Sequence, residues 1–281
     1  MEFRTKVLIP QAPFAIEPME RMLFVGSCFA DNIGRRFQDD KFMATVNPYG
    51  VMYNPASILH TVRQWLDSAD DGSLPRTVVF TLGTNHVYIL NSTGEIVDNC
   101  RKRPQRLFTE RELTVDECAQ WLTRAIDMLR ARRADVRVVI TVSPIRYAKY
   151  GFHGSQLSKA TLLLAADRVV AHYAAADEAQ RVVYFPAYEI VNDELRDYRF
   201  YREDMLHPTD QAVSYIWQCF ATAFFSQRTH DFLREWQPIK AALGHRPFNP
   251  DSEEYKVFIA KARQSERDIV SKYNDINSKT P

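Results

Sequence analysis

The stretch MLFVGSCFADNIGRRF, residues 22–37, joins an apolar run to an amphipathic helix through Gly26, Ser27 and Cys28. A buried strand that turns through a glycine straight into a helix is typical of a parallel α/β sheet. Such a turn lies at the carboxyl edge of the sheet, beside free helix N–H groups that stabilise developing negative charge. Because Gly26 has no Cβ to clash, we expect the chain to turn there and to expose Ser27.

Two roles fit Ser27 from this segment alone: it is a nucleophile, or it is only the N-cap of the helix. Cys28 is a competing nucleophile, because a thiolate is intrinsically the more reactive group. If Ser27 points into a cleft, however, its neighbour should point into the core under the helix, where a free cysteine behaves as a small apolar residue. We therefore predict Ser27 as the nucleophile and keep Cys28 as a pocket candidate.

Short apolar runs alternate with segments of helical periodicity along most of the chain. This alternation predicts a doubly wound parallel sheet of five strands with helices packed on it. The expected strands are residues 22–25, 45–47, 77–82, 137–142 and 182–185. The expected helices are residues 30–40, 55–68, 115–133, 155–176 and 208–225.

Two segments depart from this alternation. Residues 86–99, HVYILNSTGEIVDN, have period-two apolar character around a Ser-Thr-Gly turn, which predicts a β-hairpin inserted after the third strand and flanking the site. Beyond residue 228 the chain carries Trp236, Pro238 and Pro247, followed by a polar helical stretch at 252–273 with few apolar positions. We expect a main domain over residues 1–227, with a lead-in segment at 1–21, and a helical appendage over 228–281.

The composition argues against several classes of partner. Lys and Arg total 36 against 35 for Asp and Glu, so the charge favours neither nucleic acid nor an anionic membrane. The N-terminus is broken by prolines and no apolar run reaches membrane-span length, so we expect a cytoplasmic protein, although a chain trimmed of its leader would look the same. Four cysteines without a CxxC pair suggest neither a zinc site nor a disulfide framework. They are Cys28, Cys100, Cys118 and Cys219.

A serine hydroxyl needs a base, and the segment YREDMLHPTD, residues 201–210, offers one. Asp204 lies three residues before His207, close enough to fix its tautomer and to stabilise the imidazolium that forms during proton transfer. We expect His207 to face Ser27. The alternative is a loop histidine beside a solvent-exposed acid.

Acyl transfer also needs donors aimed at the developing oxyanion. Gly50 in NPYG offers an unobstructed backbone N–H, and Asn85 in TLGTNH offers a side-chain amide after the third strand. Each also fits an ordinary turn or loop role. After the fourth strand, Arg146 and His153 either line the substrate pocket or brace their loop.

These residues resemble the GSCFA family, a group of bacterial proteins in the SGNH/GDSL hydrolase superfamily. Residues 26–30 spell the motif that names the family, and the resemblance covers most of residues 20–225. It implies a three-layer α/β/α sandwich with a five-stranded parallel sheet. The other matching segments are NPYGVMYNP at 47–55, TLGT at 81–84, VDNC at 97–100, SPIRY at 143–147, GFH at 151–153, QLSKATLLLA at 156–165 and DELRDYRFYREDMLHP at 193–208.

The resemblance also implies roles for individual residues. By match to the superfamily blocks, Ser27 is the nucleophile, Asp204 and His207 are its acid–base partners, and Gly50 and Asn85 are oxyanion donors. Two positions depart from the pattern. The acidic residue usual between the block-one Gly and Ser is missing, and His86 stands where the Gly-x-Asn-Asp form of block three has its acid. Asn99 in the hairpin segment is an alternative amide donor.

The activity implied is hydrolysis of an ester through an acyl-enzyme, without metal or organic cofactor. A short acyl group on a carbohydrate, such as acetate, is the expected substrate, because such esters are common in the superfamily. Two alternatives stay open. One is transfer of the acyl group to a sugar hydroxyl, and the other is a catalytically inactive glycan-binding protein, for which the missing block-one acid leaves room. No sequence feature indicates an oligomeric state.

Overall fold

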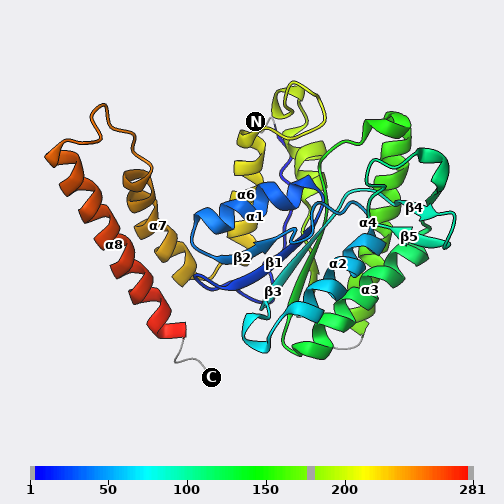
Figure 1. Ribbon diagram of the computed structural model, residues 1–281, viewed down its shortest axis with the longest axis horizontal. Helices are drawn as coiled ribbons and strands as arrows, with labels where there is room; N and C mark the ends of the chain where they lie inside the picture. Colours follow the sequence, from blue (N-terminus) through cyan, green and yellow to red (C-terminus); the bar gives the residue numbers. More distant parts are fainter. Residues whose placement is uncertain (1–3, 176–180, 278–281) are drawn as a thin grey trace.

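A five-stranded parallel sheet in the order β2-β1-β3-β7-β8 forms the centre of the computed structural model, which describes residues 4–175 and 181–277 (Figure 1). All five expected strands are present, within one or two residues of their expected ends. The strands are β1 Arg21–Gly26, β2 Met43–Val46, β3 Thr77–Leu82, β7 Arg137–Val142 and β8 Val182–Tyr184.

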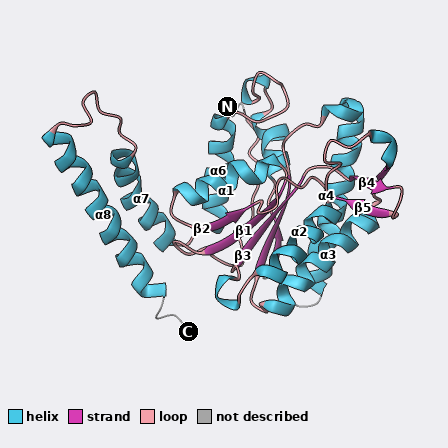
Figure 2. Ribbon diagram, in the orientation of Figure 1, coloured by secondary structure: helices cyan, strands magenta, loops and turns pink. Residues whose placement is uncertain are grey.

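Helices cover both faces of this sheet (Figure 2). Helices α1 (Cys28–Asp39) and α6 (Asp210–Phe224) lie on one face, while α2 (Pro55–Ser68), α3 (Val115–Arg132) and α4 (Gly151–Ala175) lie on the other. Side chains of β1 alternate between the layers: Met22 and Phe24 pack in the α1/α6 core, whereas Leu23 and Val25 pack in the other. Burial on both faces explains the continuous apolar strands. The predicted three-layer α/β/α sandwich is confirmed.

The predicted hairpin is also present, as strands β4 (His86–Leu90) and β5 (Glu95–Val97). A third strand, β6 (Phe108–Glu112), pairs antiparallel with the other edge of β4 and was not expected. Its sequence FTERE is polar and buries only Phe108, so it carries no apolar period that sequence inspection could detect.

Several helix ends differ from their expected positions. Helix α1 begins at Cys28, earlier than residue 30, because Ser27 caps it. Helix α4 begins at Gly151, and its expected end at Ala176 lies outside the described residues. Helix α6 begins at Asp210, directly after the cap residue Thr209, since residue 208 is held in an isolated β-bridge.

Short helical turns complete the main fold: η1 Asp71–Ser73, η2 Gln105–Leu107, η3 Ala148–Tyr150, α5 Ala187–Glu189, η4 Ile190–Leu195 and η5 Tyr198–Phe200.

The C-terminal region forms a helical hairpin of α7 (Gln227–Leu243) and α8 (Glu253–Asn277), which extends to one side of the sandwich (Figure 1). A small apolar cluster around Trp236 joins the two helices, and the indole N–H of Trp236 donates to the Asp39 carbonyl at 3.2 Å. Within the described ranges, none of the helices has the length and apolar character needed to cross a membrane.

Candidate active site

The turn between β1 and α1 lies at the carboxyl edge of the sheet, between the two strands that flank β1. Gly26 has φ +146°, and a Cβ there would meet the Thr81 carbonyl oxygen at 2.2 Å, so only glycine fits. The Gly26 N–H donates to Asn47 Oδ1 at 2.9 Å, and the Ser27 N–H donates to the Thr81 carbonyl at 2.9 Å. The turn is therefore held from both neighbouring strands.

Ser27 occupies the N-cap position of α1 and is only 2% exposed. Its Oγ accepts the Phe29 N–H at 3.2 Å and lies 3.2 Å from Thr81 Oγ1, with which it shares a hydrogen bond. The expectation of an exposed Ser27 therefore differs from the structure. The buried hydroxyl accepts an N–H group that would otherwise be unpaired at the start of α1. Ser27 therefore has the N-cap role that was the alternative to a nucleophile.

Cys28, the first residue of α1, has the opposite environment. Its side chain is partly exposed, and Sγ lies 3.6 Å from the Tyr53 hydroxyl. Its N–H has no acceptor within the helix, because first-turn N–H groups have no intrahelical partner. Burial, followed by the contact with Cys28, raises the pKa of Tyr53, so the phenol keeps its proton and can donate to sulfur. The expectation that Cys28 points into the core also differs from the structure.

Asp204 and His207 are in contact, as their spacing predicts. Asp204 Oδ2 lies 2.6 Å from His207 Nδ1, while Oδ1 accepts the backbone N–H groups of Leu206 at 2.9 Å and His207 at 3.0 Å. These hydrogen bonds, the backbone ones first, lower the pKa of Asp204, so it is a carboxylate at neutral pH. With Nδ1 bound to the carboxylate, Nε2 is the ring nitrogen left to accept a proton.

Arg146, on the loop after β7, braces the segment that carries this pair. Its N–H donates to the Leu206 carbonyl at 3.0 Å, and its guanidinium donates to the Met205 carbonyl at 2.9 Å. The guanidinium also lies 3.9 Å from the centre of the Phe152 ring. Of the two roles left open for Arg146, the contacts support the bracing one. His153 is exposed, and within the described part of the chain its side chain has no hydrogen bond or ion pair to another residue.

If the protein hydrolyses esters, as its sequence predicts, replacing Arg146 by alanine should lower kcat more than it raises KM, because the variant loses the bond that holds the loop at Met205. A misplaced catalytic group commonly costs on the order of 10²-fold in rate. Steady-state kinetics on an aryl ester would measure this. Arg199→Ala, which removes an exposed arginine paired with Asp197 on the preceding turn, is the matched control and should leave kcat unchanged. Equal losses in both variants would contradict the bracing role.

The loop after β7 also reaches the β1–α1 turn through aromatic rings. The Tyr147 ring centre lies 6.1 Å from that of Tyr53, which contacts Cys28, and 5.4 Å from that of Tyr150. Tyr150 in turn stacks on His86 at 3.6 Å. One loop thus connects the segment bearing the Asp-His pair with the Cys28 turn, and an aromatic wall leads from there to the hairpin.

The three expected oxyanion donors have other hydrogen bonds. The Gly50 N–H donates to the Asn47 carbonyl at 2.9 Å, closing a turn. The buried Asn85 amide donates to the Leu113 carbonyl at 2.8 Å. Asn99 is exposed, and its Oδ1 accepts the Arg101 N–H at 3.0 Å. None of these contacts directs a donor at the β1–α1 turn.

Lys159 is a buried residue at this edge that was not singled out from the sequence. Its Nζ donates to the carbonyls of Gly83 at 2.7 Å and Ser143 at 2.8 Å, tying together the ends of β3 and β7. Burial lowers the pKa of Lys159 to about 7. The signal was present: within QLSKATLLLA, a lysine interrupts the buried face of α4 between Ser155 and Leu162.

Fold and site together define a doubly wound α/β protein in which Ser27 and Cys28 lie at the turn after β1 and Asp204 contacts His207. The chain belongs to the GSCFA family, whose profile matches residues 21–76 and 72–220. A second profile, that of the C-terminal domain of GSCFA domain proteins, matches residues 236–280. The resemblance expected from the sequence is confirmed.

Several solved structures are similar to this chain. A family 3 carbohydrate esterase of Clostridium thermocellum is 14% identical, with 77% of this chain and 98% of that chain covered and a TM-score of 0.43. A putative acylhydrolase from Bacteroides fragilis is 13% identical, with coverage of 79% and 92% and a TM-score of 0.49. A GDSL-like lipase from Bacteroides thetaiotaomicron is 16% identical, with coverage of 73% and 87% and a TM-score of 0.46. A search of curated proteins gave no match.

Proposed function

We propose that this protein hydrolyses carboxylic esters through a covalent acyl-enzyme, with Cys28 as nucleophile and His207, oriented by Asp204, as general base. The observation that carries the proposal is the contrast at the β1–α1 turn. The Cys28 thiol is partly exposed at a helix N-terminus, whereas the Ser27 hydroxyl is 2% exposed and caps the helix. A nucleophile must be accessible to its substrate, so Cys28, and not Ser27, has this role in the proposed mechanism.

The motif supports the same assignment. In the superfamily pattern one residue, usually acidic, separates the block-one glycine from the nucleophile. Counted from Gly26, that spacing puts Ser27 in the place of the acid and Cys28 in the place of the nucleophile. The apparent loss of the acid then needs no further explanation, because Ser27 fills its position.

The proposed reaction begins when His207 Nε2 accepts the thiol proton and Sγ attacks the ester carbonyl carbon. The negative charge that develops on the carbonyl oxygen is stabilised by the free N–H of Cys28 and the positive end of α1. Collapse of this intermediate expels the alcohol, which takes the proton from His207, and leaves a thioester. Water, deprotonated by His207, then attacks the thioester and releases the carboxylic acid and the thiol.

Two neighbours assist these steps. Asp204 holds His207 in the tautomer whose Nε2 accepts a proton, and it stabilises the imidazolium. The neutral Tyr53 phenol, 3.6 Å from Sγ, can donate a hydrogen bond to the thiolate.

For the substrate we propose a short acyl group on a sugar, because Tyr53 and Tyr147 offer partly exposed aromatic surface beside the thiol. Water or a second sugar hydroxyl can accept the acyl group, and product analysis with and without a sugar acceptor distinguishes them.

The test is to trap the acyl group. The protein is mixed with 4-nitrophenyl acetate, quenched in acid and digested, and the peptide containing residues 27 and 28 is fragmented in a mass spectrometer. Release of nitrophenolate with an acetyl group on Cys28 is the expected result. An acetyl group on Ser27 would return the nucleophile to the serine. A folded protein that releases no nitrophenolate and carries no acetyl group would contradict ester hydrolysis and leave glycan binding as the better hypothesis.

A further inference from the structure

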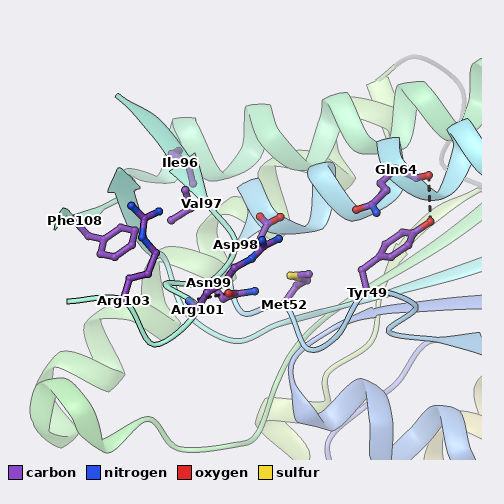
Figure 3. Close-up of a pocket in the computed structure, with 10 residues that line it drawn as sticks. All are labelled: Tyr49, Met52, Gln64, Ile96, Val97, Asp98, Asn99, Arg101, Arg103 and Phe108. Carbon is purple, nitrogen blue, oxygen red and sulfur yellow. Dashed lines mark hydrogen bonds between the residues drawn. The ribbon is translucent and has the colours of Figure 1, made fainter. Parts of the chain in front are cut away.

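A polar cavity of about 460 Å³ lies between the loop that follows β2 and the segment that follows β5. Figure 3 shows Tyr49 and Gln64 on one side of this cavity and Arg103 with Phe108 on the other. The Tyr49 hydroxyl donates to the Gln64 carbonyl at 3.2 Å, which ties its loop to α2. The cavity is large enough for one sugar-sized group.

Two consecutive residues, Met52 and Tyr53, connect the cavity with the proposed nucleophile. Met52 lines the cavity, and its N–H donates to the Gly26 carbonyl at 2.8 Å, directly before the β1–α1 turn. The next residue is Tyr53, whose hydroxyl contacts Cys28 Sγ. A substrate whose ester group is at Cys28 can therefore extend along Tyr53 and Met52 toward the cavity.

Two arginines give this cavity its charge. Arg101 and Arg103 both line it and are exposed, and among the described residues no carboxylate lies within ion-pair distance of either guanidinium. The only described contact of the Arg103 guanidinium is the Phe108 ring, at 5.6 Å from its centre. The one acid of the lining, Asp98, is bound to His60 Nδ1 at 2.8 Å. The lining thus presents two guanidinium groups that are free to bind a ligand.

The backbone that carries these arginines is held in an unfavourable conformation. Arg101 and Lys102 have φ of +46° and +56°, in the left-handed region that non-glycine residues rarely adopt. The segment is closed by the bond from the Arg101 N–H to Asn99 Oδ1, and by a bond from the Arg103 N–H to the Cys100 carbonyl at 2.8 Å. Such strain commonly marks a segment shaped for binding.

We propose that this cavity binds an anionic group on the alcohol part of the ester, a carboxylate or a phosphate, through Arg101 and Arg103. Guanidinium groups match the geometry of both anions and bind them with charge-assisted hydrogen bonds. The proposal rests on the proposed function for its ester group and adds the substrate class: an acylated sugar with a negative charge. Asn99 lines the same cavity, and its side-chain amide offers a neutral donor beside the two cations.

The test compares acetylated methyl glycosides that carry the acetyl group on the same carbon. The sugars are glucose, glucuronic acid and glucose 6-phosphate, and KM and kcat are measured separately for each. Arg101→Gln and Arg103→Gln should raise KM for the charged sugars on the order of tenfold each, with kcat and the neutral sugar unaffected. Arg106→Gln is the matched control, because Arg106 is an exposed arginine nearby that does not line the cavity.

A preference for the glucuronate identifies the anion as a carboxylate, and a preference for the phosphate identifies it as a phosphate. The proposal is overturned if the wild type does not discriminate, if the variants affect the neutral sugar equally, or if Arg106→Gln has the same effect. Ligand-observed NMR with the unacetylated sugars separates this proposal from ester hydrolysis. Anion-dependent binding that Arg101→Gln weakens, without turnover of any ester, would overturn the hydrolysis alone. Turnover without preference would overturn the anion site alone.

Discussion

Replacing Cys28 by alanine should abolish ester hydrolysis, with kcat falling by at least about 10³-fold, because no acyl-enzyme can form. Ser27→Ala should keep kcat within about tenfold of the wild type and instead lower the free energy of unfolding by about 1 kcal/mol, as expected for a lost N-cap. Nitrophenolate release measures the first effect, and urea denaturation measures the second. The two substitutions are adjacent in the chain, so their opposite effects would separate the nucleophile from the cap.

Cys219→Ala provides the matched control for this pair. Cys219 is a partly exposed cysteine on α6, away from the turn, so its removal should leave both turnover and the acetylated peptide unchanged. Full activity in Cys28→Ala together with loss of activity in a folded Ser27→Ala protein would contradict the assignment. That result would require Ser27 to leave its cap position when substrate binds.

Asp204→Asn should lower kcat by about 10³- to 10⁴-fold without unfolding the loop. The amide oxygen can still accept the Leu206 and His207 N–H groups, which bind Oδ1 in the native protein. The amide nitrogen would face His207 Nδ1 and donate to it, moving the ring proton to Nε2. Because Nε2 then cannot accept a proton, the thiol loses its base. Stopped-flow measurement of the acylation phase would detect this directly.

Glu203→Gln is the control for this prediction, since Glu203 is the exposed acid next to Asp204, whereas the described bond to the histidine ring comes from Asp204. Its acylation rate should match that of the wild type. Comparable rates in Asp204→Asn and the wild type would show that the histidine tautomer does not limit the reaction, and would contradict the role given to the pair.

Local patterns in the sequence determined most of the scaffold. Strands such as Thr77–Leu82 and Arg137–Val142 were predicted to the residue, because burial on both faces requires continuous apolar runs. The contact between Asp204 and His207 was likewise predicted, since residues three apart in the chain lie within one turn and can form this bond locally.

Only the tertiary structure decided which polar side chains are exposed and which groups they bind. Whether Ser27 or Cys28 is exposed depends on Thr81 of the neighbouring strand and on Tyr53 of the next loop, not on the turn itself. Asn85 donates its amide to the carbonyl of Leu113, a residue from the far side of the hairpin. The bracing role of Arg146 depends on a loop about 60 residues later, as the bond to Met205 shows. Such partners are distant in sequence, and hydrogen bonds are directional, so composition and spacing alone cannot predict which pairs form.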